Sequence, residues 1–290
     1  MNLIDQSQIW QAALPVYRID QDKLRFDRHL YGRWNILEPI TYEPGTARCL
    51  DLAHDFGANY GHWLHDLLPQ LLLCRTKGIP VDSIKVHPNA LQVTHVVSWT
   101  DLLEVDRTAD DVECFKLNYP LSMTSLVHPS GLKLLRDFLS LANETYTPEQ
   151  NRILLVQRCY LGSAPTESRN WEERQEFLRL TRDLPVEVVY LEDTTIFQQM
   201  ALFNSAKAII GVHGTGLSNV VFCRPGTAVI EIRSPLFWNC TYADIASYLG
   251  LRYLLIGGNE RHGNRDLHRH CVSAPARAVE ALLREQLELC

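Results

Sequence analysis

The sequence predicts an α/β protein built on parallel β-sheet. From residue 150 onward, short apolar runs rich in β-branched residues alternate with stretches of helical length. Within this part, residues 207–233 read KAIIGVHGTGLSNVVFCRPGTAVIEIR, an apolar run, a glycine-rich turn, a short helical segment and a second apolar run. Repeated alternation of strands and helices is typical of parallel sheets with right-handed crossovers.

The first half of the chain shows a weaker form of this pattern. Residues 1–45 predict an irregular lead-in with one hairpin. The segment 90–103 is ambiguous, because its apolar residues have helical spacing while its β-branched content favours a strand. For the rest of this half we expect strands at 48–53, 84–87 and 112–117, and helices at 60–75 and 129–142.

The second half is more regular, and the polar stretch 143–150 is the best candidate for a linker before it. We therefore divide the chain into residues 1–145, residues 146–275 and a closing helix within 276–290. Residues 259–270 are polar and predict a surface loop. The remaining expected elements are strands at 153–157, 186–191, 208–212, 227–232 and 253–256, and helices at 171–181, 194–204, 217–222, 242–249 and 276–289.

Composition narrows the functional class. The net charge of −6 on 290 residues argues against non-specific binding of nucleic acid. The eight cysteines form no C-x-x-C pair, which disfavours a zinc cage and favours free thiols in a reducing compartment. The N-terminus lacks the pattern of a signal peptide, and no apolar run reaches the length of a membrane span. We expect a cytoplasmic protein, and association with the inner face of a membrane stays open.

The glycine-rich turn His213-Gly214-Thr215-Gly216 is the first candidate site. Glycines allow close approach of the backbone, and the start of a helix offers N–H groups and partial positive charge to an anion. Glu231 lies near the end of the following strand, where open α/β sheets bind ligands. The pattern indicates a site for a nucleotide or another phosphorylated ligand, although glycines in such a turn equally serve packing.

A second cluster lies in residues 57–72, GANYGHWLHDLLPQLL. His62 and Asp66 are four residues apart and share a helical face. They could cap and solvate a helix end, form a general-base dyad, or bind a metal together with His65. Pro69 removes one backbone hydrogen bond, so it should bend the helix or mark its start.

Arg158 is a third candidate, because it follows a predicted strand and so takes a ligand-facing position. A guanidinium there can pair with a diphosphate in fork geometry, or with a neighbouring carboxylate. Arg169 and Asn170 precede a predicted helix and could reach the same anion, while Asn170 could equally be the N-cap of that helix.

Four segments together resemble glycosyltransferase family 61: NYGHWLHDLLPQL, Gln157-Arg158, Arg169-Asn170 and GVHGTGLSNVVFCRPGTAVIEI. The resemblance implies a GT-B architecture, in which two Rossmann-like halves with parallel sheets face a central cleft. It also implies an inverting, metal-independent transfer of a sugar from a nucleotide-diphosphate sugar, with no cofactor. The acceptor would be a hydroxyl of a glycan or glycolipid, in the biosynthesis of a capsule or lipopolysaccharide-type polysaccharide.

The resemblance also suggests roles for residues. It places the His213–Asn219 loop and Glu231 in the donor site, and Arg158 corresponds to the arginine of the family's Ser-Arg pair, with Gln157 in place of the serine. We expect His62, supported by Asp66, to be the base. Two other functions stay open: a non-catalytic nucleotide-sugar or glycan-binding module, and a metal-dependent hydrolase. The full set of expected site residues is His62 and Asp66 for catalysis, and Arg158, Arg169, Asn170, His213, Gly214, Thr215, Gly216, Asn219 and Glu231 for the donor.

Overall fold

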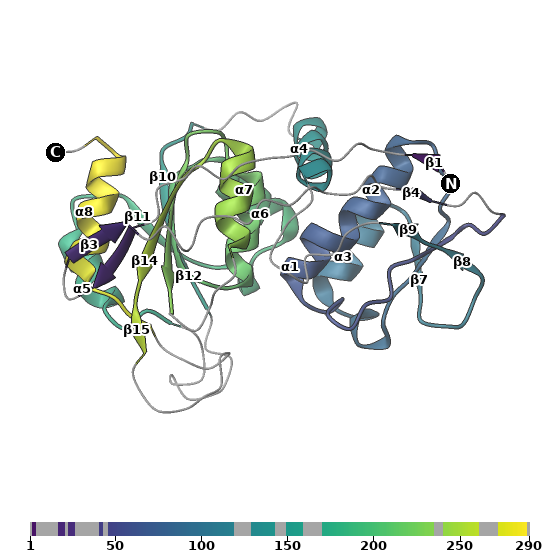
Figure 1. The fold of residues 1–290 in the computed structure, drawn as a ribbon, viewed down its shortest axis with the longest axis horizontal. Coiled ribbons are helices and arrows are strands. Elements are labelled where there is room, and N and C mark those ends of the chain that lie inside the picture. Colours follow the sequence, from purple (N-terminus) through teal and green to yellow (C-terminus); the bar gives the residue numbers. More distant parts are fainter. Residues whose placement is uncertain are drawn as a thin grey trace. The chain divides into compact units, whose positions relative to one another are not determined.

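The computed structural model describes residues 2–3, 17–20, 23–26, 41–42, 46–118, 129–142, 149–158, 170–234, 240–260 and 272–288. The chain divides into two compact units. The first comprises Met1–Trp10 and Trp34–Glu144, and the second comprises Gln11–Arg33 and Thr145–Cys290. Each unit contains helices and one parallel sheet, which confirms the predicted α/β class with two parallel sheets (Figure 1).

The first unit is built on a four-stranded parallel sheet in the order β7-β6-β5-β8. Numbered along the chain, its strands run 3-2-1-4, so the order reverses between β5 and β8. Open α/β sheets bind ligands at the carboxyl ends of the strands at such a reversal. The strands are β5 (Cys49–Asp51), β6 (Ser83–Lys85), β7 (Asp106–Thr108) and β8 (Cys114–Phe115).

In this unit one strand prediction needs correction, and one strand was not predicted. The predicted strand 112–117 is instead two short strands, β8 and β9 (Leu117–Asn118), in different sheets. β9 pairs with β4 (Thr41–Tyr42), which in turn pairs with β1 (Asn2–Leu3). β7 was not predicted because its sequence, Asp-Arg-Thr, carries no apolar run and its strand follows from pairing with β6.

The predicted helix 60–75 forms as three consecutive pieces. They are α1 (Tyr60–His62), the π-helical segment η2 (Trp63–Leu67) and α2 (Leu68–Thr76). The Asn59 side chain caps the start by accepting from the N–H groups of Gly61 and His62. Pro69 lacks the N–H that would continue regular α-helical bonding, and the wider turn lies directly before it.

The ambiguous segment 90–103 is resolved as a helix, α3 (Thr94–Leu102). Its residues Val96, Trp99 and Thr100 are buried, and this three-to-four-residue spacing keeps them on one face. The described residues of this unit also form the helices η3 (Pro88–Ala90) and α4 (Pro129–Ala142), the second at its predicted place. None of the described helices in either unit is long and apolar enough to cross a membrane.

The second unit is built on a five-stranded parallel sheet in the order β11-β10-β12-β13-β14. Numbered along the chain, this order is 2-1-3-4-5, so the reversal lies between β10 and β12. All five strands were predicted, because each is rich in apolar residues, and the inner strands β10, β12 and β13 are largely buried. They are β10 (Arg152–Gln157), β11 (Val186–Tyr190), β12 (Ala206–Val212), β13 (Ala228–Arg233) and β14 (Arg252–Gly257).

Helices cover both faces of this sheet (Figure 1). On one side lie α5 (Arg174–Leu180) and α8 (Ala276–Gln286), and on the other lie α6 (Ile196–Asn204), η6 (Thr215–Phe222) and α7 (Thr241–Leu249). The predicted helix 171–181 begins only at Arg174, because Trp171 instead bridges to Val272. Smaller elements are η5 (Leu191–Asp193), the hairpin β2 (Tyr17–Asp20)–β3 (Lys23–Phe26), and the pair β15 (Asn259–Glu260)–β16 (Val272–Ser273).

The strand pairs β2–β3 and β15–β16 bear on one predicted hairpin and one predicted loop. The hairpin expected within residues 1–45 is present as β2–β3. The segment 259–270, predicted as a loop, begins as strand β15, and its remainder lies outside the described residues.

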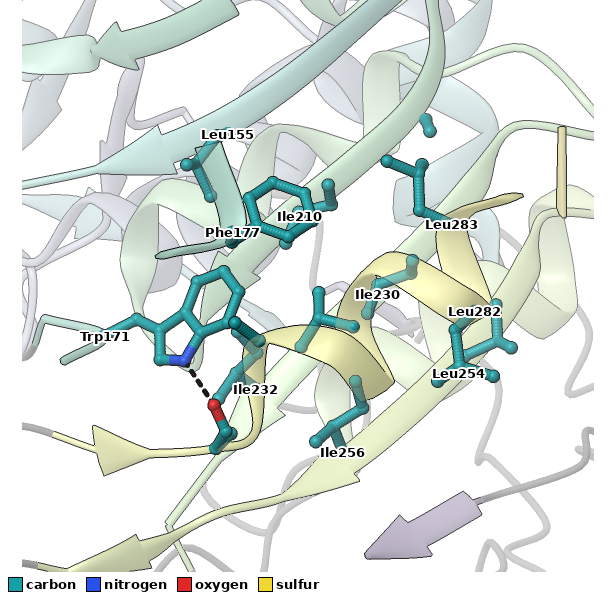
Figure 2. Close-up of a cluster of buried hydrophobic side chains, with 14 of the residues drawn as sticks. Leu155, Trp171, Phe177, Ile210, Ile230, Ile232, Leu254, Ile256, Leu282 and Leu283 are labelled. Atoms are coloured by element: carbon teal, nitrogen blue, oxygen red, sulfur yellow. Dashed lines mark hydrogen bonds between the residues drawn. The ribbon is translucent and has the colours of Figure 1, made fainter. Parts of the chain in front are cut away.

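One apolar cluster of the second unit lies between the sheet and α5 and α8 (Figure 2). Alternate residues of each strand point toward these helices, among them Ile210, Ile230 and Ile232. The Trp171 ring closes the cluster, and its Nε1–H donates to the carbonyl of Ala274 at 2.8 Å. Since this face is apolar, the residues between them in sequence, including the polar Glu231, point to the opposite face.

The five cysteines within the described residues are free thiols. Cys49 and Cys114 lie directly opposite each other on β5 and β8, with their sulfur atoms 2.9 Å apart. Burial raises the pKa of the Cys74 thiol to about 12, so this thiol stays protonated and unreactive.

Replacing Leu282 by alanine should destabilise the second unit. Leu282 is buried in the cluster, and truncating a buried leucine costs about 2–5 kcal/mol through lost burial and the cavity left behind. Glu285→Ala, an exposed change on the same helix, is the control. Urea unfolding followed by circular dichroism measures both, and equal stabilities would contradict the role given to α8.

Candidate functional site

The loop after β12 and the residue after β10 meet at the strand reversal of the second unit. β10 and β12 are neighbours in the sheet, and Arg158 and His213 follow directly on their carboxyl ends. A Cβ added to Gly214 would lie 2.8 Å from Nη2 of Arg158. The absence of a side chain at position 214 therefore makes room for the guanidinium.

The Arg158 guanidinium is poorly solvated. Desolvation lowers the pKa of the Arg158 side chain, and the attraction of Glu192 and Tyr242 raises it by less. Among the residues that the structure describes, no carboxylate forms an ion pair with it. Arg158 is half-buried, and a desolvated cation is costly unless negative charge compensates it, so an anionic ligand bound here would stabilise the arrangement.

The other loop glycine has a packing role. A Cβ on Gly216 would lie 3.1 Å from Cγ1 of Val156 and 3.3 Å from Cδ1 of Leu191. Asn219 is buried and donates to Oε1 of Gln199 at 3.0 Å and to the carbonyl of Gly216 at 3.4 Å. These contacts fix the loop against the sheet and α6, while Gly214 faces the charged side chain.

A buried polar network lies beneath the loop. His213 Nδ1 is 2.6 Å from Oε1 of Glu231, and the Tyr253 hydroxyl donates to the other carboxylate oxygen. Burial alone would raise the pKa of Glu231, which is 1% exposed, but His213, Arg233 and Tyr253 together hold that pKa below its usual value. Glu231 is therefore ionised, and both of its oxygens are engaged within the protein.

This geometry gives Glu231 a specific task. A carboxylate bonded to Nδ1 of a histidine fixes the orientation and tautomer of the ring. The Glu231 carboxylate thus orients His213 at the start of the loop. The carboxylate is buried and both of its oxygens are bonded within the protein, so it does not point out toward a ligand.

Three residues of this site were missed in the sequence. The Tyr242 hydroxyl donates to the carbonyl of Gly214 at 2.6 Å, and its ring lies 5.2 Å from that of His213. Tyr253 and the buried Arg233 complete the network around Glu231. Arg233 could have been found, because a charged residue that ends an apolar strand gave the signal for Arg158. The two tyrosines lie within a predicted helix and a predicted strand, and neither gave such a signal.

Of the remaining residues expected near the donor, the structure describes Gln157 and Asn170. Gln157 is buried, and its Oε1 accepts from Arg174 at 3.3 Å, so its side chain lies on the α5 face of the sheet. Asn170 is also buried, and its carbonyl accepts from the N–H of Val272. Asn170 is not the N-cap of α5, because Glu173 takes that position. Arg169 lies outside the described residues.

In the first unit, His62 and Asp66 form a close pair. His62 Nδ1 is 2.7 Å from Oδ2 of Asp66, and the carboxylate is almost fully buried while the imidazole is 28% exposed. A carboxylate that accepts from Nδ1–H leaves Nε2 as the basic nitrogen of the ring. The pair has the geometry of a general base held by a carboxylate.

The metal-site alternative for these residues finds no geometric support. His65 is buried, and the Asp66 oxygen that would ligate an ion is bonded to His62. Within the described ranges, no three His, Cys, Asp or Glu side chains gather as ligands for an ion.

The His62 ring also belongs to an aromatic cluster. Phe56 stacks on it with ring centroids 5.2 Å apart and planes inclined by 23°. His54 lies 5.6 Å from Phe56 and 6.1 Å from His62. The three rings stand on the loop between β5 and α1 and on α1 itself.

Stability should depend on pH through Asp244, which is buried in the first turn of α7. Burial raises its pKa from 3.8 to about 7. The folded protein then holds this proton more tightly than the unfolded chain, so stability falls as pH rises from about 4 to 7. Asp244→Asn removes this loss, and its melting temperature should exceed that of the wild type by several degrees at pH 8 and by less at pH 5. Asp106→Asn, an exposed change, is the control, and a pH-independent difference for Asp244→Asn would contradict the assignment.

Comparison with known proteins agrees with the segments from which the resemblance was drawn. A family model, Glycosyltransferase 61, matches residues 60–230, more than half of the 290-residue chain. The match includes the His62–Asp66 helix, Arg158, the His213–Gly216 loop and the first half of β13. A search among curated proteins found no match. The chain belongs to glycosyltransferase family 61.

Proposed function

We propose that this transferase takes its sugar from a nucleotide-diphosphate sugar and moves it, with inversion, to a hydroxyl of a glycan or glycolipid. The observation that carries the proposal is the contact between Arg158 and Gly214 at the strand reversal of the second unit. It combines a half-buried positive charge, a backbone without a side chain and the start of η6 at one sheet edge. These are the features that bind a diphosphate.

The donor side of the reaction is assigned to the second unit. The Arg158 guanidinium would pair with the diphosphate, and the amides of the Gly214–Gly216 turn would add hydrogen bonds as charge develops on the leaving group. Glu231 would act through His213 by holding its ring beside the loop. Thr215 and Asn219 belong to the same loop, and Asn219 would maintain its shape. Arg169 and Asn170 are further donor residues in this proposal.

Activation of the acceptor is assigned to the first unit. His62 Nε2 would take the proton of the acceptor hydroxyl, while Asp66 would hold the ring and stabilise the imidazolium that forms. The acceptor oxygen would attack the anomeric carbon opposite the leaving group as the bond to the diphosphate oxygen breaks. The negative charge would then remain on the nucleoside diphosphate, beside Arg158.

The proposal includes several finer points from the resemblance. We propose a GT-B arrangement of the two Rossmann-like halves, and a reaction that needs neither a metal ion nor a cofactor. Polysaccharide biosynthesis on the cytoplasmic side of a membrane is the setting that suits such a donor and acceptor.

Removing the Arg158 charge should abolish donor binding without unfolding the protein. In a thermal-shift screen of nucleotide-diphosphate sugars, the wild type should show a higher melting temperature with its donor, because a ligand that binds only the folded state stabilises it. Arg158→Ala should lose that shift, and Gly214→Ala should reduce it by displacing the guanidinium. Arg152→Ala, at the opposite end of the same strand, is the matched control. A full donor shift in Arg158→Ala would refute the phosphate assignment.

Removing the His62–Asp66 pair should stop turnover and leave donor binding intact. His62→Ala and Asp66→Asn should each lower the transfer or hydrolysis rate of a labelled donor about 10²–10⁴-fold, the usual contribution of general-base catalysis. His87→Ala, a histidine that caps η3 in the same unit, should stay near the wild-type rate. Rates within a few-fold of wild type in both variants would mean that another group is the base. Donor binding without any turnover in the wild type would favour a non-catalytic binding module.

A further inference from the structure

Phe56 is an exposed aromatic residue beside the His62–Asp66 pair. Its side chain is 49% exposed, although it follows the buried strand β5 by only a short loop. The other large apolar side chains described as exposed are Leu102, Val112 and Phe197. Of the two exposed phenylalanines, Phe56 is the one with a described ring contact to a histidine. A phenyl ring held out in water next to a polar pair is typical of a recognition surface.

The loop that carries Phe56 is tightly bonded. The N–H of Phe56 donates to Nδ1 of His54 at 3.1 Å, and the carbonyl of Phe56 accepts from the N–H of Asn59 at 2.8 Å. The N–H of Gly57 donates to the carbonyl of His54 at 2.8 Å, and a Cβ on Gly57 would lie 3.0 Å from that oxygen. These bonds hold the backbone of the loop in place before any ligand arrives, which reduces the entropy lost on binding.

The loop also lies at the expected ligand edge of the first unit. It leaves the carboxyl end of β5, where the strand order reverses between β5 and β8. Asp51 and Lys116 form an ion pair of 3.1 Å at the same ends of these two strands. An aromatic face for C–H groups beside charged groups for hydroxyls is the combination that binds a sugar ring, because the negative face of the aromatic ring attracts the C–H bonds.

We propose that Phe56, through the face of its ring turned away from His62, is the stacking platform for the pyranose ring of the acceptor. The occupant is a neutral sugar rather than a nucleobase, since the features that bind a diphosphate lie in the second unit. Phe56 would bind the acceptor and take no part in proton transfer. The assignment rests on the proposed function, in that His62 is the base.

The test uses the full chain and a panel of methyl glycosides: the β-gluco-, β-galacto-, α-manno- and β-xylopyranosides. Saturation-transfer difference NMR reports which ring protons of each sugar contact the protein. The wild type should saturate the C–H protons on one face of at least one sugar. Phe56→Ala should lower that signal at least fivefold, and Phe56→Trp should restore it. Phe197→Ala, another exposed phenylalanine, is the control and should match the wild type.

Uridine diphosphate and guanosine diphosphate, added to the same samples, separate this inference from the proposed function. Nucleotide binding that is equal in wild type and Phe56→Ala shows an intact protein, so loss of the glycoside signal alone supports the platform. The inference is overturned if no glycoside is saturated by the wild type, or if Phe56→Ala keeps the full signal. It is also overturned if Phe56→Ala loses nucleotide binding and keeps the glycoside. Donor-sugar transfer that is absent while the glycoside signal depends on Phe56 would refute the transferase proposal, and Phe56 would then be a sugar-stacking residue without a role in binding an acceptor.

Discussion

The constraint on which the candidate site of the second unit depends is the placement of the half-buried Arg158 guanidinium. Arg158 leaves β10 at the point where the strand order reverses, and its guanidinium fills the space that a side chain at Gly214 would occupy. The loop after β12 must therefore keep its shape around that charge. Gly216, packed against Val156 and Leu191, and Asn219, bonded to the Gly216 carbonyl, supply the rigidity.

The sheet separates this polar site from the apolar core. One face packs against α5 and α8 through residues such as Ile230 and Ile232, so the residue between them, Glu231, must point to the other face. There it is buried with His213, Tyr253 and Arg233, and their combined attraction keeps it ionised. A fully bonded network of this kind gives the His213 ring one orientation, which a catalytic or binding loop requires.

The sequence was most informative where structure is set locally. The five strands of the second unit were predictable because each is rich in apolar residues, and the glycine loop was predictable from its place after β12. The division of roles among the residues of the site could not be predicted from the sequence. That Gly214 makes room for Arg158 while Gly216 serves packing depends on the spacing of two strands from distant parts of the chain. Tyr242 and Tyr253 reach the site through the same tertiary pairing, and β7 exists only because β6 offers it a partner.

The juxtaposition of Cys49 and Cys114 has a practical consequence for handling the protein. Thiols whose sulfurs lie 2.9 Å apart are in position to form a disulfide once an oxidant accepts their two electrons. Such a bond would close a covalent ring around α1, η2, α2 and α3, and so around both His62 and Phe56. Preparations kept with reductant and preparations left in air would then differ in the part of the molecule assigned to the acceptor, and a comparison of variants needs a single redox state throughout.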